Sequence, residues 1–460
     1  MTEKALTLCH MRAEEPCIEN VRFVKIMLAR RCLPVAAMIG LSVLTGFSGL
    51  WRAGLSWASG FQIRENSATG LGTAFAGAGS AADDLSTIFN NPAGMTRLGA
   101  NKAEAVLNFI APSAVFEGGA SLGGARVAGT ASADGGDTVV VPAFYALYSL
   151  SPEMKFGVAI TSPFGLRTTY PDNWVGRYAA IDSELTSINI NPNLAYRLTD
   201  TLSVAGGLVA QRLEAKESNA INFSGIGAPD GFSQFSGDGW GYGLDGGLLF
   251  EPTQSTRFGL TYRSQIAQTL RGRASFRDIP APVLALDPAL SNQDAHAELR
   301  TPATLTASLY HELTPRLALM ADAQWTHWSS FKNFGVFSAS RTLLANETEN
   351  WGDSWFTAAG VKYRYNDFLT LRTGFAYDAT PVKDVNRNAR LPDNDRFWLA
   401  LGFTRTLAPG VDLTGGYAHL FAGNPTINEP FGNSLFGSGT LTGSYSDHID
   451  IVSLALTASF

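Results

Sequence analysis

Residues 188–198 read ININPNLAYRL, a stretch in which apolar and polar side chains alternate. In an extended chain one face carries Ile188, Ile190, Pro192, Leu194, Tyr196 and Leu198. The opposite face carries Asn189, Asn191, Asn193, Ala195 and Arg197. Because successive side chains of a strand point to opposite faces, the pattern predicts a β-strand with one apolar and one polar face.

The same alternation recurs along the chain after residue 101. Fourteen such segments start near residues 102, 138, 154, 185, 202, 239, 256, 298, 316, 354, 368, 395, 410 and 447. Tight turns are predicted at residues 151–153, 199–200, 251–252, 314–315, 366–367 and 408–410, with long loops between the hairpins. Short turns at one end and long loops at the other are typical of outer-membrane proteins. The sequence therefore predicts an all-β fold, a 14-stranded antiparallel transmembrane β-barrel over residues 101–460.

Aromatic side chains at strand ends favour this barrel over a soluble β-sandwich, which would alternate in the same way. They include Trp355, Tyr363, Tyr365 and Trp398, and they suit the girdles at the two membrane interfaces. The last predicted strand ends the chain on Phe460, which resembles the signal that bacterial barrel-assembly machinery reads. We expect a monomer in the Gram-negative outer membrane, in contact with its lipid and with both termini in the periplasm.

The beginning of the chain indicates export. Arg30 and Arg31 precede an uncharged apolar run at residues 33–50, which is the layout of a signal peptide. A membrane-anchor helix is the alternative, and it is disfavoured by the marginal length of the run. Four helix-breaking residues also weaken it: Pro34, Gly40, Gly46 and Gly49.

Cleavage is expected after Ala58, because Ser56 and Ala58 place small side chains at the third and the first position before the cut. Residues 1–58 are then a signal peptide with an upstream extension, for which Met27 is an alternative start. The intact mass of the protein taken from the outer membrane checks this. It should correspond to residues 59–460, and a mature start upstream of residue 50 would contradict the assignment.

The net charge of the chain and the positions of its cysteines exclude some classes of binding partner and of covalent crosslink. Of the 34 basic and 40 acidic residues, 7 and 4 lie in the leader, so the mature chain keeps 27 and 36 and has a net charge of −9. No basic patch points to a nucleic-acid partner. Cys9, Cys17 and Cys32 all lie in the leader, which excludes a disulfide framework in the body of the protein. No cofactor and no metal site is expected.

Residues 59–100 precede the first predicted strand and do not alternate. Residues 70–94 read GLGTAFAGAGSAADDLSTIFNNPAG and are dominated by small side chains. Fourteen strands enclose a lumen that their own side chains cannot fill, and small residues permit close packing against its wall. We therefore predict that residues 59–100 form a hatch that plugs the barrel from the periplasmic side.

The hatch is expected to be held by charge and by a rigid corner. Asp83 and Asp84 are predicted to pair with wall groups such as Arg257 or Arg263. In Asn91-Pro92-Ala93 the proline fixes its own φ and favours an extended conformation for the residue before it. The asparagine amide is then available to backbone groups that would otherwise lie unpaired in the lumen.

Short motifs in the chain resemble a known family. They are SGFQ at 59–62, Glu65, Ser67, GLG at 70–72, AG at 76–77, ADD at 82–84, NPA at 91–93, SPFG at 162–165, WVGRY at 174–178 and QWTHWS at 324–329. Together they resemble the FadL/TodX (OMPP1) family of outer-membrane transporters for long-chain fatty acids and other hydrophobic compounds. The resemblance implies passive uptake of a hydrophobic small molecule, with no catalytic residue.

The resemblance also implies a route for the ligand. In the family a ligand binds an apolar groove between two extracellular loops, moves to a tighter lumenal pocket and leaves sideways where the third strand kinks inward. Here the groove falls in residues 217–238 and 268–298, and the candidate ligand-binding side chains are Phe223, Phe232, Phe235, Phe276 and Leu284. The kink falls at Ser162-Pro163-Phe164-Gly165, where the proline cannot donate to a strand ladder. A loop that begins there is the alternative.

A carboxylate ligand needs a cation. The candidates are Arg212, Lys216, Arg263 and Arg372. The first two correspond loosely to a family position that contacts the head group, and the last two fall on polar faces by alternation. A salt bridge within the wall is the alternative role for each of them.

Other functions remain as alternatives. One is an uptake channel for aromatic hydrocarbons, as in the TodX branch of the family. An open polar porin is another, although it would need no hatch. An outer-membrane lipase is the third, because His327 and Ser329 share a strand face, but the Asn-Gly that follows this pair in outer-membrane phospholipase is missing.

Overall fold

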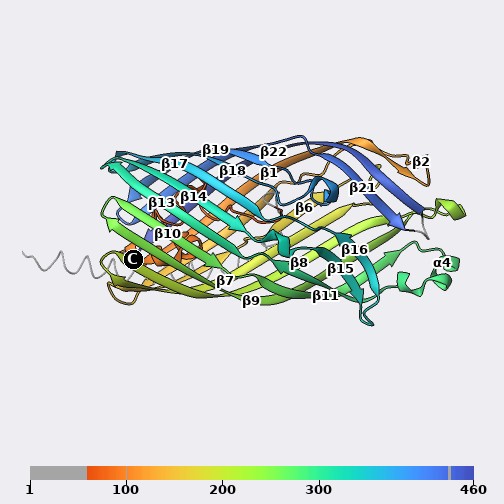
Figure 1. Cartoon of the computed structure of the whole chain (residues 1–460), viewed down its shortest axis with the longest axis horizontal. Helices are drawn as coiled ribbons and strands as arrows, with labels where there is room; N and C mark the ends of the chain where they lie inside the picture. Colours follow the sequence, from red (N-terminus) through yellow and green to blue (C-terminus); the bar gives the residue numbers. More distant parts are fainter. Residues whose placement is uncertain (1–59, 100, 434–436) are drawn as a thin grey trace, which may run out of the picture. The chain divides into compact units, whose positions relative to one another are not determined.

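The computed structural model describes residues 60–99, 101–433 and 437–460. The predicted signal peptide and its cleavage site lie outside these residues. The described chain forms a wall of tilted antiparallel strands (Figure 1). Among the described residues, no helix has the length and hydropathy needed to cross a bilayer.

Fourteen of the described strands form the wall, each hydrogen-bonded to the next. In order they are β1 (Lys102–Leu122), β4 (Val139–Ser149), β5 (Met154–Thr161), β7 (Asp182–Thr199), β8 (Leu202–Ile221), β9 (Gly231–Thr253), β10 (Thr256–Arg263), β13 (Thr304–Thr314), β14 (Leu317–Thr326), β17 (Ser354–Asn366), β18 (Leu369–Asp378), β19 (Arg396–Ala408), β20 (Val411–Ala422) and β22 (Gly437–Ser459). Since β22 pairs with β1, the ring is closed. The predicted 14-stranded antiparallel barrel is confirmed.

Short turns join the hairpins of the wall at one end. They lie at residues 150–153, 200–201, 254–255, 315–316, 367–368 and 409–410. The start of β1 and the end of β22 lie at this same end, because Lys102 pairs with Ser459. The prediction that both chain ends lie at the short-turn end is confirmed, and short turns are typical of the periplasmic end of an outer-membrane barrel.

The prediction began the eighth wall strand too early, near residue 298 instead of at Thr304. Residues near 298 form β12 (Gln293–Thr301), which pairs with β11 (Ile266–Arg277) in the connection that follows β10. The eighth wall strand is β13, which pairs with β10. Both β12 and β13 alternate in polarity, so periodicity alone cannot distinguish a wall strand from a loop hairpin.

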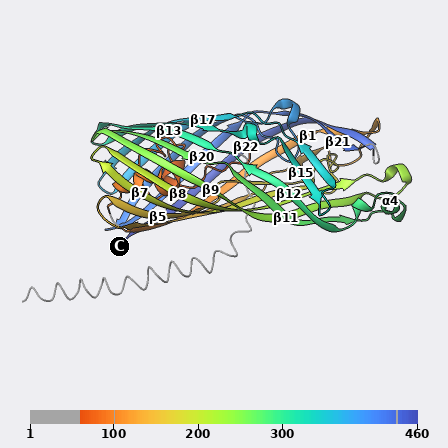
Figure 2. The ribbon, with the colours of Figure 1, turned by 60° about the horizontal axis from the view of Figure 1, so that its bottom comes forward.

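The remaining elements belong to the long connections of the extracellular end. The strands are β2 (Ala125–Arg126), β3 (Ser132–Asp134), β6 (Gly165–Thr169), β11, β12, β15 (Asn333–Ser338), β16 (Leu343–Thr348) and β21 (Thr426–Asn433). The helical turns are η2 (Ser224–Ile226), α4 (Ala281–Leu286), η3 (Pro288–Leu290), η4 (Trp328–Ser330) and η5 (Asp384–Asn386). Figures 1 and 2 show β21 and α4 at the end of the wall opposite the C-terminus.

The wall is apolar outside and polar inside. On β7, Ile190 and Leu194 are 39% and 47% exposed, whereas Asn189, Asn191 and Asn193 are buried. A water-filled lumen would expose these asparagines. Asn193 donates to the Ile88 carbonyl of the N-terminal segment, residues 60–99, which lies inside the wall. Asn189 and Asn191 are bonded by other inward side chains of the wall, Gln211 and Asp245.

The N-terminal segment contains α2 (Ala68–Leu71), α3 (Thr87–Asn90) and η1 (Pro92–Arg97), joined by turns. Its glycines come very close to the wall. A Cβ on Gly72 would lie 2.9 Å from the Cα of Gly402 on β19, and a Cβ on Gly79 would lie 2.9 Å from the Cβ of Ser308 on β13. Side chains at these positions would push the segment away from the wall, which explains the small residues of the stretch.

Candidate functional site

The third strand of the wall is broken. β5 ends at Thr161 and β6 begins at Gly165, and both pair with β7. Thr161 lies opposite Asn189 and Gly165 lies opposite Thr186, so four steps along the broken strand face three steps along β7. The surplus residue is a bulge. Pro163 lies within this bulge. Its lack of an N–H is tolerated there, because no hydrogen bond of the strand ladder is needed at this position.

The break interrupts the backbone pairing of the wall on one side. β4 pairs with β5 only from Phe144 to Ser149, and Val139–Ala143 pair with β1 alone. β6 pairs with β7 alone. Among the described residues, no ladder therefore joins β4 to β6. The outward side chains of the flanking strands are apolar and exposed, namely Phe109 on β1 and Ile190 on β7, so we expect this side of the wall to face lipid.

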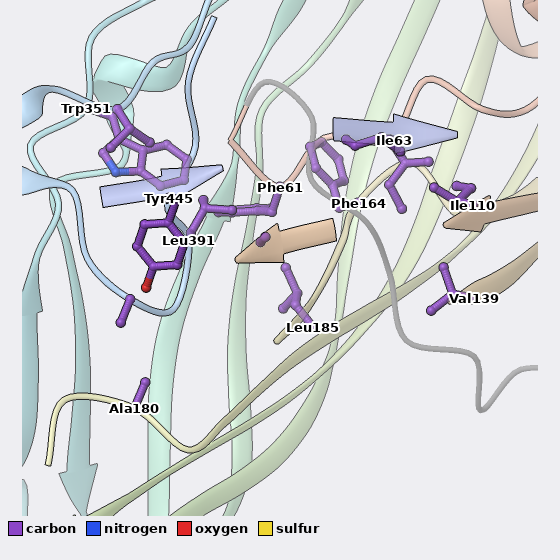
Figure 3. Close-up of a cluster of buried hydrophobic side chains, with 14 of the residues drawn as sticks. Phe61, Ile63, Ile110, Val139, Phe164, Ala180, Leu185, Trp351, Leu391 and Tyr445 are labelled. Atoms are coloured by element: carbon purple, nitrogen blue, oxygen red, sulfur yellow. The ribbon is translucent and has the colours of Figure 1, made fainter. Parts of the chain in front are cut away.

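The start of the N-terminal segment lies against this interruption from inside. Ile63 N–H donates to the Pro163 carbonyl at 2.8 Å, and Gly165 N–H donates to the Phe61 carbonyl at 2.8 Å. Gln62 and Phe164 form an antiparallel bridge between these two bonds. Residues 61–63 thus act as a short strand laid across the break. Figure 3 shows Phe61, Ile63 and Phe164 in one cluster of buried side chains.

Phe61 is held in an aromatic cage from the connection between β14 and β17. Its ring centroid lies 4.7 Å from that of Trp328, 5.4 Å from Phe331 and 5.6 Å from Trp351. Gly60 has a φ of +66°, and a Cβ there would lie 2.4 Å from a Trp351 ring atom. Only glycine fits this close approach at positive φ.

Two cavities lie near this cage. An outer cavity of about 330 Å³ opens among the extracellular connections. Its apolar lining includes Tyr178, Phe235, Phe276, Leu290, Leu344 and Phe431. A deep pocket of about 50 Å³ lies beside the cage and is lined by Phe61, Leu185, Phe331, Trp351 and Leu391 among others.

Two of the predicted groove residues, Phe235 and Phe276, line the outer cavity. Phe223 is buried against Gly231, and Phe232 packs under the guanidinium of Arg277. Leu284 is exposed on α4. None of these three belongs to the lining of the outer cavity.

None of the four predicted cations lines either cavity. Arg212 and Lys216 alternate with buried residues of β8, so they project from the outer face of the wall, where they pair with Asp238 and Asp182. Arg263 and Arg372 are inside the barrel, as alternation indicated. They contact the N-terminal segment, at the carbonyl of Phe89 and at Asp83 respectively.

The charge pairing of the N-terminal segment differs from the prediction. Asp83 pairs with Lys362 at 2.7 Å and with Arg372 at 3.5 Å, rather than with Arg257 or Arg263. Burial by itself would raise the pKa of Asp83, but the two cations outweigh burial and lower this pKa to about 2. Asp84 accepts hydrogen bonds from Ser67 and Ser86 of the segment itself.

The side chain of Asn91, in the predicted corner, makes three hydrogen bonds. The Asn91 Nδ2 group donates to the Gly79 carbonyl at 2.7 Å and to the Leu248 carbonyl of β9 at 2.9 Å. Its Oδ1 accepts from Ala93 N–H at 3.2 Å, which caps η1 with Pro92 in the first position. The asparagine thus joins two turns of the segment to the wall.

The sequence reasoning missed Arg390, which lines both cavities. It lies in the connection between β18 and β19, in the stretch Arg387-Asn388-Ala389-Arg390. Two arginines within a long polar connection are a weak signal. Alternation cannot orient a side chain outside a strand, so this residue could not be assigned to the lumen.

Comparison with known proteins agrees with this architecture. Residues 49–460 match the family model described as outer membrane protein transport protein (OMPP1/FadL/TodX). The long-chain fatty acid transport protein of Escherichia coli K12 is 28% identical over 411 residues, which cover 81% of this chain and 90% of that protein.

Two solved structures share the fold. A FadL homologue from Pseudomonas aeruginosa has a TM-score of 0.82 at 24% identity, over 87% of this chain and all of the homologue. The toluene transporter TbuX of Ralstonia pickettii has a TM-score of 0.63 at 18% identity, over 85% and 98% of the two chains. With the matched family model spanning the whole barrel, the chain belongs to the OMPP1/FadL/TodX family of outer-membrane transport proteins.

Proposed function

We propose that this protein takes up long-chain fatty acids or similar hydrophobic compounds passively across the outer membrane. The ligand enters the outer cavity, moves to the deep pocket beside Phe61 and leaves sideways between β4 and β6. The break at residues 162–164 carries this proposal. A lateral opening that faces lipid suits a cargo that leaves water for an apolar phase. The name of the Escherichia coli relative supports the same class of cargo.

The route requires movement. The deep pocket, at about 50 Å³, is far below the roughly 300 to 1,000 Å³ of ordinary ligand sites. Residues 61–63 also obstruct the opening from inside. We therefore infer that this structure is the closed state, and that cargo passes when Phe61 leaves its cage and residues 61–63 leave the break.

The bridge between Gln62 and Phe164 provides a direct test. The hydrogen bonds on either side make it a non-hydrogen-bonded pair, for which Cα atoms lie about 4.5 Å apart. That separation is within the reach of a disulfide. The chain has no cysteine after residue 32, so a Gln62→Cys/Phe164→Cys variant forms one defined crosslink.

The oxidised variant is expected to keep oleate binding in the outer cavity. Lipid vesicles that contain this oxidised protein are expected to lose oleate uptake. Reduction should restore uptake. The single variants Gln62→Cys and Phe164→Cys control for the lost side chains. Normal uptake by the crosslinked protein would contradict the lateral exit, and a wild-type protein that binds no oleate would contradict the cargo.

A neutral aromatic cargo is the second candidate, and the aromatic cage favours it. Trp351 and Phe331 line the deep pocket with rings that could stack on a small aromatic hydrocarbon. The same vesicle experiment with toluene in place of oleate separates the two. Crosslink-sensitive uptake of toluene without uptake of oleate would establish the second candidate.

A further inference from the structure

The connection that carries Arg390 crosses the lumen. It leaves the wall between β18 and β19, and Arg390 reaches β7 and β8, where its Nη1 donates to Ser183 Oγ at 3.0 Å and to the Ser218 carbonyl at 3.3 Å. In the order of the wall, β18 and β19 stand seven positions from β7 and β8, half of the ring of fourteen. A single side chain thus joins opposite walls.

Two carboxylates hold the guanidinium group of Arg390. Its Nε pairs with Glu347 of β16 and lies 3.9 Å from the Glu217 carboxylate of β8. The arginine side chain is only 7% exposed. Its Nη2 group makes no hydrogen bond to any residue that the structure describes. Of the two donors on one edge of the planar guanidinium group, Nε donates a hydrogen bond to a described residue and Nη2 does not.

The backbone around Arg390 is fixed independently of these ion pairs. The Ala389 N–H donates to Glu429 Oε2 at 2.7 Å, and the Ala389 carbonyl accepts from the Tyr170 hydroxyl at 2.9 Å. The Arg390 carbonyl accepts from Thr168 Oγ1 at 2.8 Å. The side chain can exchange partners while its own backbone stays in place.

The outer cavity and the deep pocket share three lining residues, Glu217, Glu347 and Arg390. These three residues, of which the two glutamates pair with Arg390, therefore form the partition between the outer cavity and the deep pocket. Burial raises the pKa of nearby Glu349 and of Glu429 to about 8.

From this geometry we infer that Glu217, Arg390 and Glu347 form an ionic latch that a carboxylate head group opens, which makes Arg390 the residue that selects acids over neutral hydrocarbons. The inference rests on the proposed function. A carboxylate in the outer cavity can take both Nε and Nη2 in a bidentate pair, whereas Glu347 uses Nε alone. Exchange of partners releases Glu347 and opens the partition toward Phe61.

The test compares oleate with oleyl alcohol, which has the same chain and no charge. Arg390→Gln is expected to weaken oleate binding by about tenfold to a hundredfold, the loss of a charge-assisted hydrogen bond, and to leave binding of the alcohol unchanged. Lys383→Gln is the matched control, because it makes the same charge change at an exposed position of the same connection. The control should bind both ligands as the wild type does.

Glu347→Gln tests the latch while keeping the cation, and it covers the case in which Arg390→Gln does not fold. It should increase affinity for oleate relative to the alcohol, because a competitor of the head group is weakened. An unchanged ratio of the two affinities in either folded variant would overturn the latch. A wild-type protein that binds neither ligand would overturn the proposed function instead, so the two failures are distinguishable.

Discussion

Deletion of residues 60–90 is expected to leave a folded barrel that conducts small polar solutes, whereas the intact protein conducts little. The ladder of the wall closes without this segment, because the fourteen strands pair with one another and β22 pairs with β1. To the strand pairing of the wall, the segment contributes the bridge from Gln62 to Phe164 of the broken strand. Inner cations such as Lys362 and Arg263 would become hydrated in the flooded lumen, which removes the cost of leaving them without partners.

Single-channel conductance in a planar bilayer measures the effect. We expect an increase of about tenfold or more, since a wall of this size encloses more space than its own side chains fill. Deletion of the exposed α4 turn, residues 281–286, is a control that should leave the conductance low. A deletion variant that folds and conducts no more than the wild type would contradict the role of the N-terminal segment as a plug.

Asp83→Asn is expected to loosen the N-terminal segment at neutral pH. The substitution leaves Lys362 and Arg372 without their anion, and both are largely buried. Removing one partner of a buried pair costs about 3 to 5 kcal/mol. Hydrogen exchange of residues 60–99 should accelerate in the variant, and the bilayer current should show brief openings.

Asp84→Asn is the matched control. It makes the same change one residue away, where the carboxylate contacts hydroxyl groups of the segment rather than wall cations. It should leave both measurements close to those of the wild type. Equal effects of the two substitutions would show that the ion pairs of Asp83 do not hold the segment.

The wild type should reproduce the loosened state in acid. The pKa of Asp83 is lowered to about 2 in the folded protein, below the value of roughly 4 for an unperturbed aspartate. The stabilisation is therefore complete above pH 4 and is lost as the pH falls through 2. Asp83→Asn should lack this dependence.

The wall was predictable because its information is local. In β7 the polarity of each side chain and of its neighbours indicates the face of the strand on which it lies. The structure agrees, because the polar asparagines are buried and the apolar residues between them are exposed. Alternation also placed Arg263 and Arg372 inside. The same rule, applied to Arg212, would have placed it outside, because Arg212 shares a strand face with the apolar Leu202, Val204 and Leu208.

The site was less predictable because its contacts join distant parts of the chain. Phe61 meets Trp328 and Trp351, which are more than 260 residues away in sequence. Asp83 could have paired with any inward cation, and only the position of the segment selects Lys362 and Arg372. Arg390 lies in a connection, where no periodicity indicates direction.

The seam between β1 and β22 has a consequence for synthesis. Register pairs run from Lys102 with Ser459 to Leu122 with Gly439, so the first strand of the wall obtains its second neighbour only from the last. A nascent or truncated chain exposes two unpaired strand edges, which are templates for aggregation. Closure over so large a sequence separation is also slow. Both edges become paired only when β22 has been made, so an incomplete chain differs from a complete one by its exposed strand edges. Periplasmic chaperones and proteases can recognise incomplete chains by these edges.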